Sequence, residues 1–258
     1  MKPWIDLTGQ VALVTGSAAG IGRATASGLA ERGASVVLLD RDGAGAEAAA
    51  EAIRSVGGQA EARAHDVTSA KEWDALAQWV AEKWGRLDIL VNSAGIARFD
   101  RVDEEMFDNY REVFAVNVEG SLLGMTMALK FMRAARIGAI VNVSSTAALK
   151  GNPAMANYGA SKAAIAHFTR SAALELNRAG LDVRVNAVMP GFTDTAMAQQ
   201  VHDRFDDKLG GRDATMKVFS SGRAAEPEEI ANMIIFLASG RASFVSGSVI
   251  AVDRAQSA

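Results

Sequence analysis

Short apolar runs alternate along the chain with longer stretches in which apolar positions recur at helical spacing. The short runs are rich in β-branched residues and have the length of strands that are buried on both faces. Strands are predicted at residues 11–15, 35–39, 60–65, 87–91, 139–143, 183–188 and 249–252. Helices are predicted from the turn after the first strand to about residue 32, and at residues 44–56, 70–84, 104–133, 157–179 and 226–238.

This alternation of strands and helices predicts an α/β fold with one doubly wound parallel β-sheet, a Rossmann fold. We expect a single domain over all 258 residues, because folds of this kind often reach such a length. Ligands then bind beyond the carboxyl ends of the strands. Residues 196–222 are polar, mixed in charge and contain Gly210 and Gly211, which indicates a substrate lid.

Composition narrows the class of protein. Hydrophobic residues make up 49% of the chain and the net charge is −3, so we expect no bulk attraction to nucleic acid or to an anionic membrane. The absence of cysteine excludes disulfides and thiolate chemistry and agrees with a cytoplasmic location. No uncharged apolar run reaches the ~18 residues of a membrane helix, and we expect no secretory signal. We expect no metal, because the histidines are scattered at His65, His167 and His202.

The first predicted strand leads into a turn that contains Gly16, Gly20 and Gly22, and a helix follows at once. Glycines let the backbone approach a pyrophosphate, and the start of the helix supplies N–H groups and the positive end of its dipole. A glycine-rich turn alone is weak evidence, since tight turns also favour glycine. Between a strand and a helix, however, it predicts dinucleotide binding, with Ala19 and Ile21 in the same turn.

The second predicted strand is followed by Asp40, about 20 residues after the glycine turn. A carboxylate at this point can accept hydrogen bonds from both hydroxyls of the adenosine ribose, which favours NAD. The alternative is an ordinary turn or helix-cap aspartate. Use of NADP would need a cation here, and Arg41 is the candidate for that role.

Tyr158 and Lys162 are four residues apart and project from one face of a predicted helix. A cation about 4 Å from a phenol, at an effective dielectric constant of ~20, is worth about 4 kcal/mol and would bring the pKa of Tyr158 near neutrality. Ser145, at the end of the preceding strand, has a hydroxyl that can hold a substrate oxygen against the phenol. A surface helix with a solvated lysine is the alternative, and for this short motif alone it would prevail.

Further motifs accompany this group. Residues 15–22 read T-G-S-A-A-G-I-G, residues 92–95 read N-S-A-G, and residues 190–195 read P-G-F-T-D-T. In these motifs, the chain resembles the short-chain dehydrogenase/reductase family, whose patterns are T-G-x-x-x-G-I-G, N-N-A-G and P-G-x-x-x-T. Asn117, Ser145, Tyr158 and Lys162 also fall in the order and spacing of the family's catalytic tetrad. The resemblance covers essentially the whole chain.

The resemblance implies a reversible hydride transfer between a nicotinamide dinucleotide and an alcohol or a carbonyl. Tyr158 would be the general base in oxidation and the acid in reduction. Lys162 would bind the nicotinamide ribose and lower the pKa of Tyr158, Ser145 would hold the substrate oxygen, and Asn117 would anchor a water beside Lys162. The protein then needs one proton relay, one oxygen clamp and correct positioning, because the cofactor carries the hydride.

The other residues of the expected site bind the cofactor and the substrate. By resemblance, residues 66–67 would flank the adenine, Asn92 and Gly95 the ribose and adenine side, and the main chain around Thr193, with Thr195, the carboxamide. The full set of expected cofactor contacts is Gly16, Ala19, Gly20, Ile21, Gly22, Asp40, Arg41, Asp66, Val67, Asn92, Ala94, Gly95, Tyr158, Lys162, Pro190, Gly191, Thr193 and Thr195. The expected substrate contacts are Ser145, Ala147, Tyr158 and Phe192.

Two positions depart from the family pattern. The family usually closes its last strand with D-G-G, whereas Asp253 is followed here by Arg254 and Ala255. The segment after the strand, often near a neighbouring subunit's site in the family, is therefore expected to take a different course. Ser93 replaces an asparagine and removes one amide contact.

The expected substrate is a neutral secondary alcohol or its ketone. By analogy with the family, the residues that face the pocket are mostly apolar: Ile96, Ala147, Leu149, Met155, Phe192 and Met197. In the lid, Arg204, Lys208, Arg212 and Lys217 are balanced by Asp203, Asp206, Asp207 and Asp213. A self-paired lid surface is the preferred interpretation. A homotetramer built on the helices at residues 104–133 and 157–179 is expected by analogy.

Two alternatives to an NAD-dependent dehydrogenase stay open. One is an NADP-dependent carbonyl reductase of the same fold. The other is a regulatory protein that binds a dinucleotide without catalysis, against which the complete tetrad argues.

Overall fold

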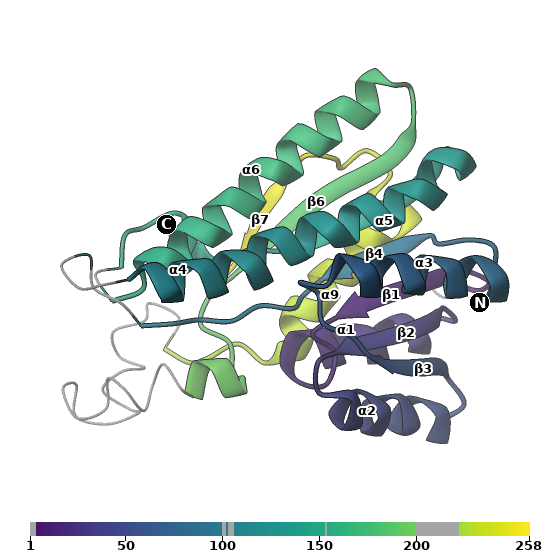
Figure 1. Cartoon of the computed structure of the whole chain (residues 1–258), viewed down its shortest axis with the longest axis horizontal. Helices are drawn as coiled ribbons and strands as arrows, with labels where there is room; N and C mark the ends of the chain where they lie inside the picture. The colour runs from purple at the N-terminus through teal and green to yellow at the C-terminus, as the bar shows by residue number, and fades with distance from the viewer. Residues whose placement is uncertain (1–3, 100–101, 103–105, 153, 200–221) are drawn as a thin grey trace.

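The computed structural model describes residues 4–99, 102, 106–152, 154–199 and 222–258. Its centre is one seven-stranded parallel sheet in the order β3-β2-β1-β4-β5-β6-β7, which confirms the doubly wound α/β fold (Figure 1). The strands are β1 (Val11–Thr15), β2 (Ser35–Asp40), β3 (Gln59–Ala64), β4 (Ile89–Asn92), β5 (Ile137–Val143), β6 (Asp182–Pro190) and β7 (Val249–Val252). The predicted strands are all present, with ends displaced by two residues at most.

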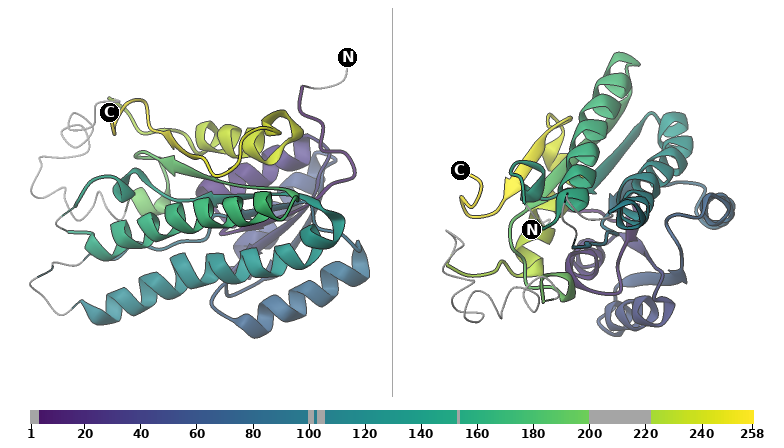
Figure 2. Two further views of the ribbon diagram at one scale, coloured as in Figure 1. Left: turned by 90° about the horizontal axis from the view of Figure 1, so that it is seen from above. Right: turned by 60° about the vertical axis from the view of Figure 1, so that its left-hand side comes forward.

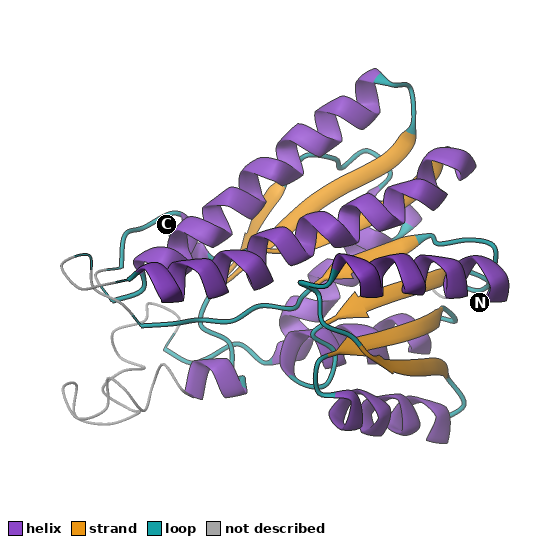
Figure 3. Cartoon of the chain, in the orientation of Figure 1, coloured by secondary structure: helices purple, strands orange, loops and turns teal. Residues whose placement is uncertain are grey.

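Helices cover both faces of this sheet, as Figures 2 and 3 show. The helices are α1 (Gly20–Glu31), α2 (Gly43–Ser55), α3 (Ala70–Lys83), α4 (Phe107–Phe114), α5 (Gly120–Ala135), α6 (Ala156–Arg178) and α9 (Pro227–Ala238), with the π-helix η1 (Ala115–Glu119) and the 3-10 helices η2 (Thr146–Ala148) and η3 (Gly240–Ala242). The core beneath α1, α2 and α9 is separate from the core beneath α3, α5 and α6. This arrangement places the amino ends of α1 and α6 at the carboxyl edge of the sheet.

Side chains of a single strand enter both cores. In β1, Ala12 and Val14 pack under α1 and α9, while Val11 and Leu13 pack under the helices of the other face. Successive side chains of a strand point to opposite faces, so a strand buried on both sides is mostly apolar along its whole length. This is why the apolar runs predicted the strands well.

The helix expected at residues 104–133 is not one continuous α-helix. Of its first residues, 104 and 105 lie outside the described part of the chain, α4 begins at Phe107, and the π-helix η1 separates α4 from α5. A π-turn widens the helix by one residue and is frequent at functional sites. Asn117 lies in this turn.

The glycines of this helix serve close packing. A Cβ atom on Gly120 would lie 2.7 Å from Cγ2 of Val67, and one on Gly124 would lie 2.6 Å from Oδ1 of Asn92. The glycines therefore let the helix approach the ends of β3 and β4 instead of interrupting it.

The predicted lid lies largely outside the described residues. Residues 200–221 are not described, and of the remainder, residues 196–199 are helical. The lid prediction and its charged residues therefore stay predictions.

Candidate active site

The glycine turn joins β1 to α1 through two close backbone contacts. Gly16 has a φ of 65°, and a Cβ atom there would lie 2.7 Å from Cα of Ala94. A Cβ atom on Gly22 would lie 2.1 Å from the carbonyl oxygen of Gly16. Real Cβ atoms do not approach other atoms this closely, so both positions need glycine. Gly20, with a φ of 55°, needs it for its left-handed backbone.

The start of α1 fits a dinucleotide pyrophosphate. Ala19 occupies the N-cap position without a side-chain cap, and the first turn of the helix carries no acidic residue. The N–H groups of Gly20, Ile21 and Gly22 therefore face the turn with the positive end of the helix dipole behind them. Small residues leave room beside these groups, which is the arrangement that binds phosphates.

Asp40 is held beside this turn by two main-chain groups. Its Oδ2 accepts a hydrogen bond from the N–H of Ala18 at 3.0 Å, and its Oδ1 accepts one from the N–H of Asp42 at 2.9 Å. The half-buried carboxylate is thus fixed against the glycine turn, where the prediction placed the adenosine ribose. Arg41 is exposed next to it.

At the end of β3, the Asp66 side chain is engaged in its own turn. Its Oδ1 accepts hydrogen bonds from the N–H and the hydroxyl of Thr68 at 2.9 and 2.8 Å, and these bonds hold the pKa of Asp66 below its usual value. Val67 is buried, and its carbonyl oxygen accepts a hydrogen bond from Nε1 of Trp73. The side chains of both residues are fixed, so an adenine contact here falls mainly to the main chain.

The loop after β4 is tied to the end of β1. Oγ1 of Thr15 accepts hydrogen bonds from the N–H groups of Ser93 at 3.1 Å and Ala94 at 3.0 Å. The Asn92 side chain points into the interior, where its Nδ2 donates to the Ser121 carbonyl and to Oδ1 of Asn142. The Asn92 amide therefore braces α5 and β5, and its expected place beside the cofactor is left to its main chain.

Asn117 connects the π-helix to the loop after β4 and to α6. Its Oδ1 accepts a hydrogen bond from the N–H of Ile96 at 2.8 Å, and its Nδ2 donates to the Ile96 carbonyl and to Oγ of Ser161 at 3.0 Å each. Oγ of Ser161 in turn donates to the Tyr158 carbonyl. The main-chain carbonyl of Asn117 accepts the hydroxyl of Ser121 at 2.8 Å. The sequence interpretation missed Ser161, although its place directly before Lys162 was a usable signal.

Lys162 is the buried cation of the site. Its side chain is 4% exposed, its Nζ donates to the Val143 carbonyl at 2.9 Å, and the same Nζ lies 5.7 Å from the ring centroid of Tyr158. A Cβ atom on Gly95 would lie 3.1 Å from this Nζ and 3.3 Å from Oδ1 of Asn117, so these three residues meet. Burial lowers the pKa of Lys162 to about 8.

Tyr158 and Ser145 form a hydrogen bond at the carboxyl edge of the sheet. The expected lowering of the tyrosine pKa was wrong for this structure. Burial raises the pKa of Tyr158, and the bond with Ser145 offsets that effect only in part. The ammonium of Lys162 is directed to the Val143 carbonyl, so it does not provide the close contact with the phenol that the prediction assumed.

The loop after β6 completes the site. The hydroxyl of Thr193 donates to the Gly191 carbonyl, and Oγ1 of Thr195 accepts a hydrogen bond from the N–H of Ala198. A side chain that the sequence interpretation did not consider also contacts this loop, because Oε1 of Gln256 accepts a hydrogen bond from the N–H of Phe192 at 3.0 Å. At Ala147, on the other side of Ser145, the N–H donates to the Ser145 hydroxyl.

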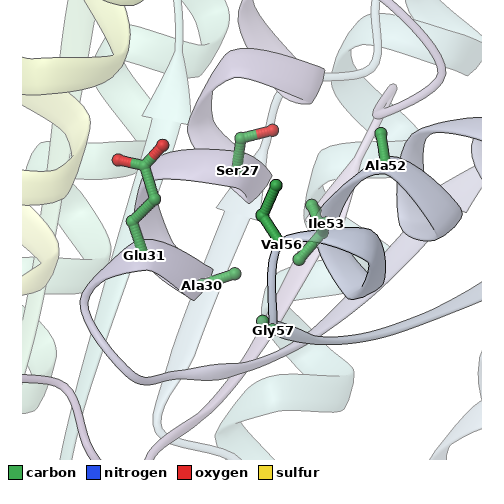
Figure 4. Close-up of a pocket in the computed structure, with 8 residues that line it drawn as sticks. Ser27, Ala30, Glu31, Ala52, Ile53, Val56 and Gly57 are labelled. Carbon is green, nitrogen blue, oxygen red and sulfur yellow. The ribbon is translucent and has the colours of Figure 1, made fainter.

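Two cavities lie away from the Tyr158–Lys162 pair. One, of about 280 Å³, is lined by Ser27, Ala30, Glu31, Ala52, Ile53, Val56, Gly57 and Gly58 (Figure 4). It lies between the carboxyl ends of α1 and α2, at the opposite edge of the sheet from the glycine turn. The other, of about 160 Å³, lies beside the loop after β6, and Gln256 is among the residues that line it.

These features match a known family. The short chain dehydrogenase family matches residues 10–205. The chain belongs to this family. Among relatives, it is 37% identical to the 3-oxoacyl-[acyl-carrier-protein] reductase FabG of Thermotoga maritima, over 96% of this chain and 97% of the relative. It is 42% identical to the cis-4-hydroxycyclohexanecarboxylate dehydrogenase of Sinomonas cyclohexanicum and 39% identical to the cyclopentanol dehydrogenase of a Comamonas species, each over 95% of both chains.

Solved structures agree with this assignment. The structure of levodione reductase superposes with a TM-score of 0.91 at 31% identity, over 97% of this chain and 98% of the other. A protein described as an NAD(P)-dependent gluconate 5-dehydrogenase from Beutenbergia cavernae, with NADP bound at low occupancy, has a TM-score of 0.88 at 35% identity, over 97% and 98% of the two chains. The chain is thus a short-chain oxidoreductase with a Rossmann fold. Among the helices of its described residues, none is both long and apolar enough to cross a bilayer.

Proposed function

We propose that this protein transfers a hydride reversibly between NAD(H) and a secondary alcohol or its ketone. The observation that carries the proposal is the group formed by Ser145, Tyr158 and Lys162, in which a buried ammonium lies below the ring of a phenol that is hydrogen-bonded to a serine. When bound, the nicotinamide supplies or accepts the hydride. The residues of the protein then need only to place the substrate and move one proton.

In this proposal, each side chain has one task. The Ser145 hydroxyl holds the substrate oxygen, and the Tyr158 hydroxyl donates a proton to that oxygen in reduction and accepts one in oxidation. A raised pKa keeps Tyr158 protonated at neutral pH, which suits the acid in ketone reduction. Lys162 donates to the nicotinamide ribose, and Asn117 fixes the wall of the site through Ile96 and Ser161.

The preference for NAD is assigned to Asp40. A 2′-phosphate carries nearly two negative charges, and at about 5 Å from the Asp40 carboxylate the repulsion is roughly 1.7 kcal/mol even with the dielectric constant of water. That is more than tenfold in affinity, to which lost ribose hydrogen bonds add. The test is kcat/KM for NAD and NADP in the wild type and in Asp40→Ser. NAD is expected to be favoured and the variant to reduce or reverse the preference, while a wild type that favours NADP refutes it.

The proposed substrate is a neutral, cyclic secondary alcohol or its ketone. Ile96, Ala147 and Phe192, which would face the substrate, are half-buried at the mouth of the site, and Met155 is buried. An apolar pocket rewards buried carbon at about 25 cal/mol per Å² and strongly disfavours an unpaired charge. The similarity to a cyclopentanol dehydrogenase supports a cyclic alcohol.

A matched pair of substrates tests this choice. Cyclohexanol and 4-hydroxycyclohexanecarboxylate share the ring and the alcohol but differ in charge, and NADH absorbance follows both. We expect the higher kcat/KM for cyclohexanol. If the carboxylate gives the higher value, and Arg204→Ala or Arg212→Ala removes its advantage, the neutral substrate is wrong. Both arginines lie outside the described residues.

A second candidate is the reduction of a 3-oxoacyl thioester with NADPH. The 37% identity to a 3-oxoacyl-[acyl-carrier-protein] reductase over nearly the whole chain favours it, as does the neighbouring structure with NADP. An acetoacetyl thioester, assayed with NADH and NADPH beside the cyclic ketones, decides between the two. The NAD-dependent proposal fails if the thioester with NADPH gives the highest kcat/KM.

A further inference from the structure

The segment after β7, residues 253–258, turns back onto the loop after β6. The N–H of Gln256 donates to the Asp253 carbonyl and the N–H of Ser257 donates to Oδ2 of Asp253, which closes a compact turn. Arg254 and Ala255 have φ values of 49° and 64°, in the left-handed region that favours glycine. Two side chains thus occupy backbone positions that favour glycine, and the expectation of a course different from the family's stays a prediction. Figures 1 and 2 show this end of the chain on the same side of the molecule as the start of α6.

This turn presents the Gln256 side chain to the loop. Its Oε1 accepts the N–H of Phe192 at 3.0 Å, and a Cβ atom on Gly191 would lie 2.5 Å from the same Oε1. Glycine at position 191 is therefore what lets the amide reach the loop. Nζ of Lys150, which follows η2, approaches the Gln256 carbonyl at 3.4 Å and joins the segment to the strand end that carries Ser145.

The loop after β6 makes hydrogen bonds with Val252, Gln256 and Ala225, and the main-chain N–H of Thr193 points away from these partners. The Gly191 N–H donates to the Val252 carbonyl, the Phe192 N–H donates to Gln256, and the Asp194 N–H and the Phe192 carbonyl bond to Ala225. In the bridge between Thr193 and Ala225, the neighbours of Thr193 make the bonds, so the main-chain N–H of Thr193 points away from Ala225. That N–H is in the place where the family resemblance puts the nicotinamide carboxamide.

We propose that Gln256 is a positioning residue, which fixes the loop through the Phe192 N–H so that the Thr193 main chain is set to receive the nicotinamide carboxamide. This inference rests on the proposed function and assigns a task to a residue outside the expected tetrad. Without Gln256, the loop keeps its hydrogen bonds to Val252 and Ala225 but loses the hydrogen bond from the Phe192 N–H, which lies between them. Binding of the nicotinamide end should then weaken while binding of the adenosine end should not.

Two ligands separate the two ends. NADH carries the nicotinamide, whereas ADP-ribose has the same adenosine and pyrophosphate without it. Dissociation constants are measured by calorimetry for the wild type, Gln256→Leu, Gln256→Glu and the control Ser257→Ala. Leucine at position 256 removes the acceptor of the Phe192 N–H, whereas glutamate keeps a carboxylate oxygen that can accept it. Ser257→Ala is a control because Ser257 makes its contact within the turn through its main-chain N–H, which alanine retains.

For Gln256→Leu we expect NADH binding to weaken about fivefold, the effect of one neutral hydrogen bond, and ADP-ribose binding to stay within about twofold. Gln256→Glu and Ser257→Ala should resemble the wild type with both ligands. Amide exchange without any ligand should be faster at residues 191–195 in Gln256→Leu alone. Should Gln256→Leu not fold, Gln256→Asn, one methylene shorter, takes its place with the same expectation.

Equal weakening of both ligands in Gln256→Leu, no weakening of either, or a Gln256→Glu that behaves like leucine would overturn the inference. The proposed function fails separately. It fails if the wild type binds neither ligand, or if it binds NADH but turns over no alcohol or ketone. If the wild type binds and turns over and Gln256→Leu behaves in the same way, only the role of Gln256 is refuted.

Discussion

The two halves of the site are built by different means. The half that would receive the adenosine and the pyrophosphate, from β1 to Asp40, is made of backbone and small residues within one β-α-β unit. The half that would receive the nicotinamide is made of side chains from segments far apart in the chain, such as Asn117, Ser145 and Lys162. In the first half the shape of the backbone would carry cofactor binding, so an added atom should be harmful. In the second half, the orientation of polar groups would carry the chemistry, so a lost hydrogen bond should be harmful.

Electrostatics divides the halves in the same way. The first half offers the partial positive charge of the α1 amino end, which does not titrate. The second half holds a full charge on Lys162, in a buried place where its pKa falls to about 8. Only the second half should therefore respond to pH near neutrality.

The largest expected effect comes from removing one oxygen in the second half. In Tyr158→Phe the ring and its packing stay, but the hydroxyl that donates or accepts the proton is lost. General acid–base catalysis contributes about 10²–10⁴-fold, so kcat should fall by at least about a hundredfold. The Kd of NADH, measured by fluorescence titration, should change little.

A Tyr158→Phe protein that keeps a tenth of the wild-type kcat on a good substrate contradicts the role of this phenol. Lys162→Ala is the informative partner, because it should weaken both turnover and NADH binding. If the two variants have the same profile, the division between proton transfer and cofactor binding is wrong.

The next effect comes from adding one carbon in the first half. In Gly22→Ala the new Cβ would lie 2.1 Å from the Gly16 carbonyl oxygen, so the turn must move. Such overpacking costs about 1–3 kcal/mol, and the melting temperature should fall together with affinity for both NADH and ADP-ribose.

Gly240→Ala is the matched control, since nothing lies within 4 Å of a Cβ atom there and its φ is not positive. The control should melt and bind like the wild type. Equal behaviour of the two variants would mean that the glycine turn does not set the shape of the first half.

This contrast also explains what the sequence could predict. Strands buried on both faces leave continuous apolar runs, and the glycine turn and Asp40 are contiguous with two of them, so the fold and the first half were predictable from local patterns. Within the second half, the identity of Ser145, Tyr158 and Lys162 was predictable from spacing. Their contacts were not, because a hydrogen bond between distant segments leaves no periodic signal.

Three particulars show this limit. The π-turn at Asn117 depends on bonds to Ile96 in another loop, so the helical pattern gave no sign of it. The direction of the Tyr158 pKa depends on the balance between burial and the hydrogen bond with Ser145, which the spacing between Tyr158 and Lys162 does not fix. The contact of Gln256 joins residues 64 positions apart.

The smallest and most specific prediction concerns pH. Burial lowers the pKa of Lys162 to about 8, so its ammonium is charged below that pH and loses its proton above it. A ribose hydroxyl that accepts a hydrogen bond from Lys162 is bound more tightly by the charged form, so the Kd of NADH should be constant up to about pH 7 and then rise, by at most about tenfold per pH unit. In Lys162→Met, NADH binding should be weaker and show no such rise. The stability effect has the opposite sign. Because the pKa of Lys162 is lower in the folded protein than its ordinary 10.5, folding opposes protonation, and stability relative to Lys162→Met should increase as the pH rises from about 8 to 10.5. Denaturant titrations at these pH values measure it, and charges shared by the two proteins cancel in the difference. A Kd that stays constant to pH 9.5 would show that Lys162 does not hold the cofactor, and the second half of the site would then lack the titrating group that distinguishes it from the first.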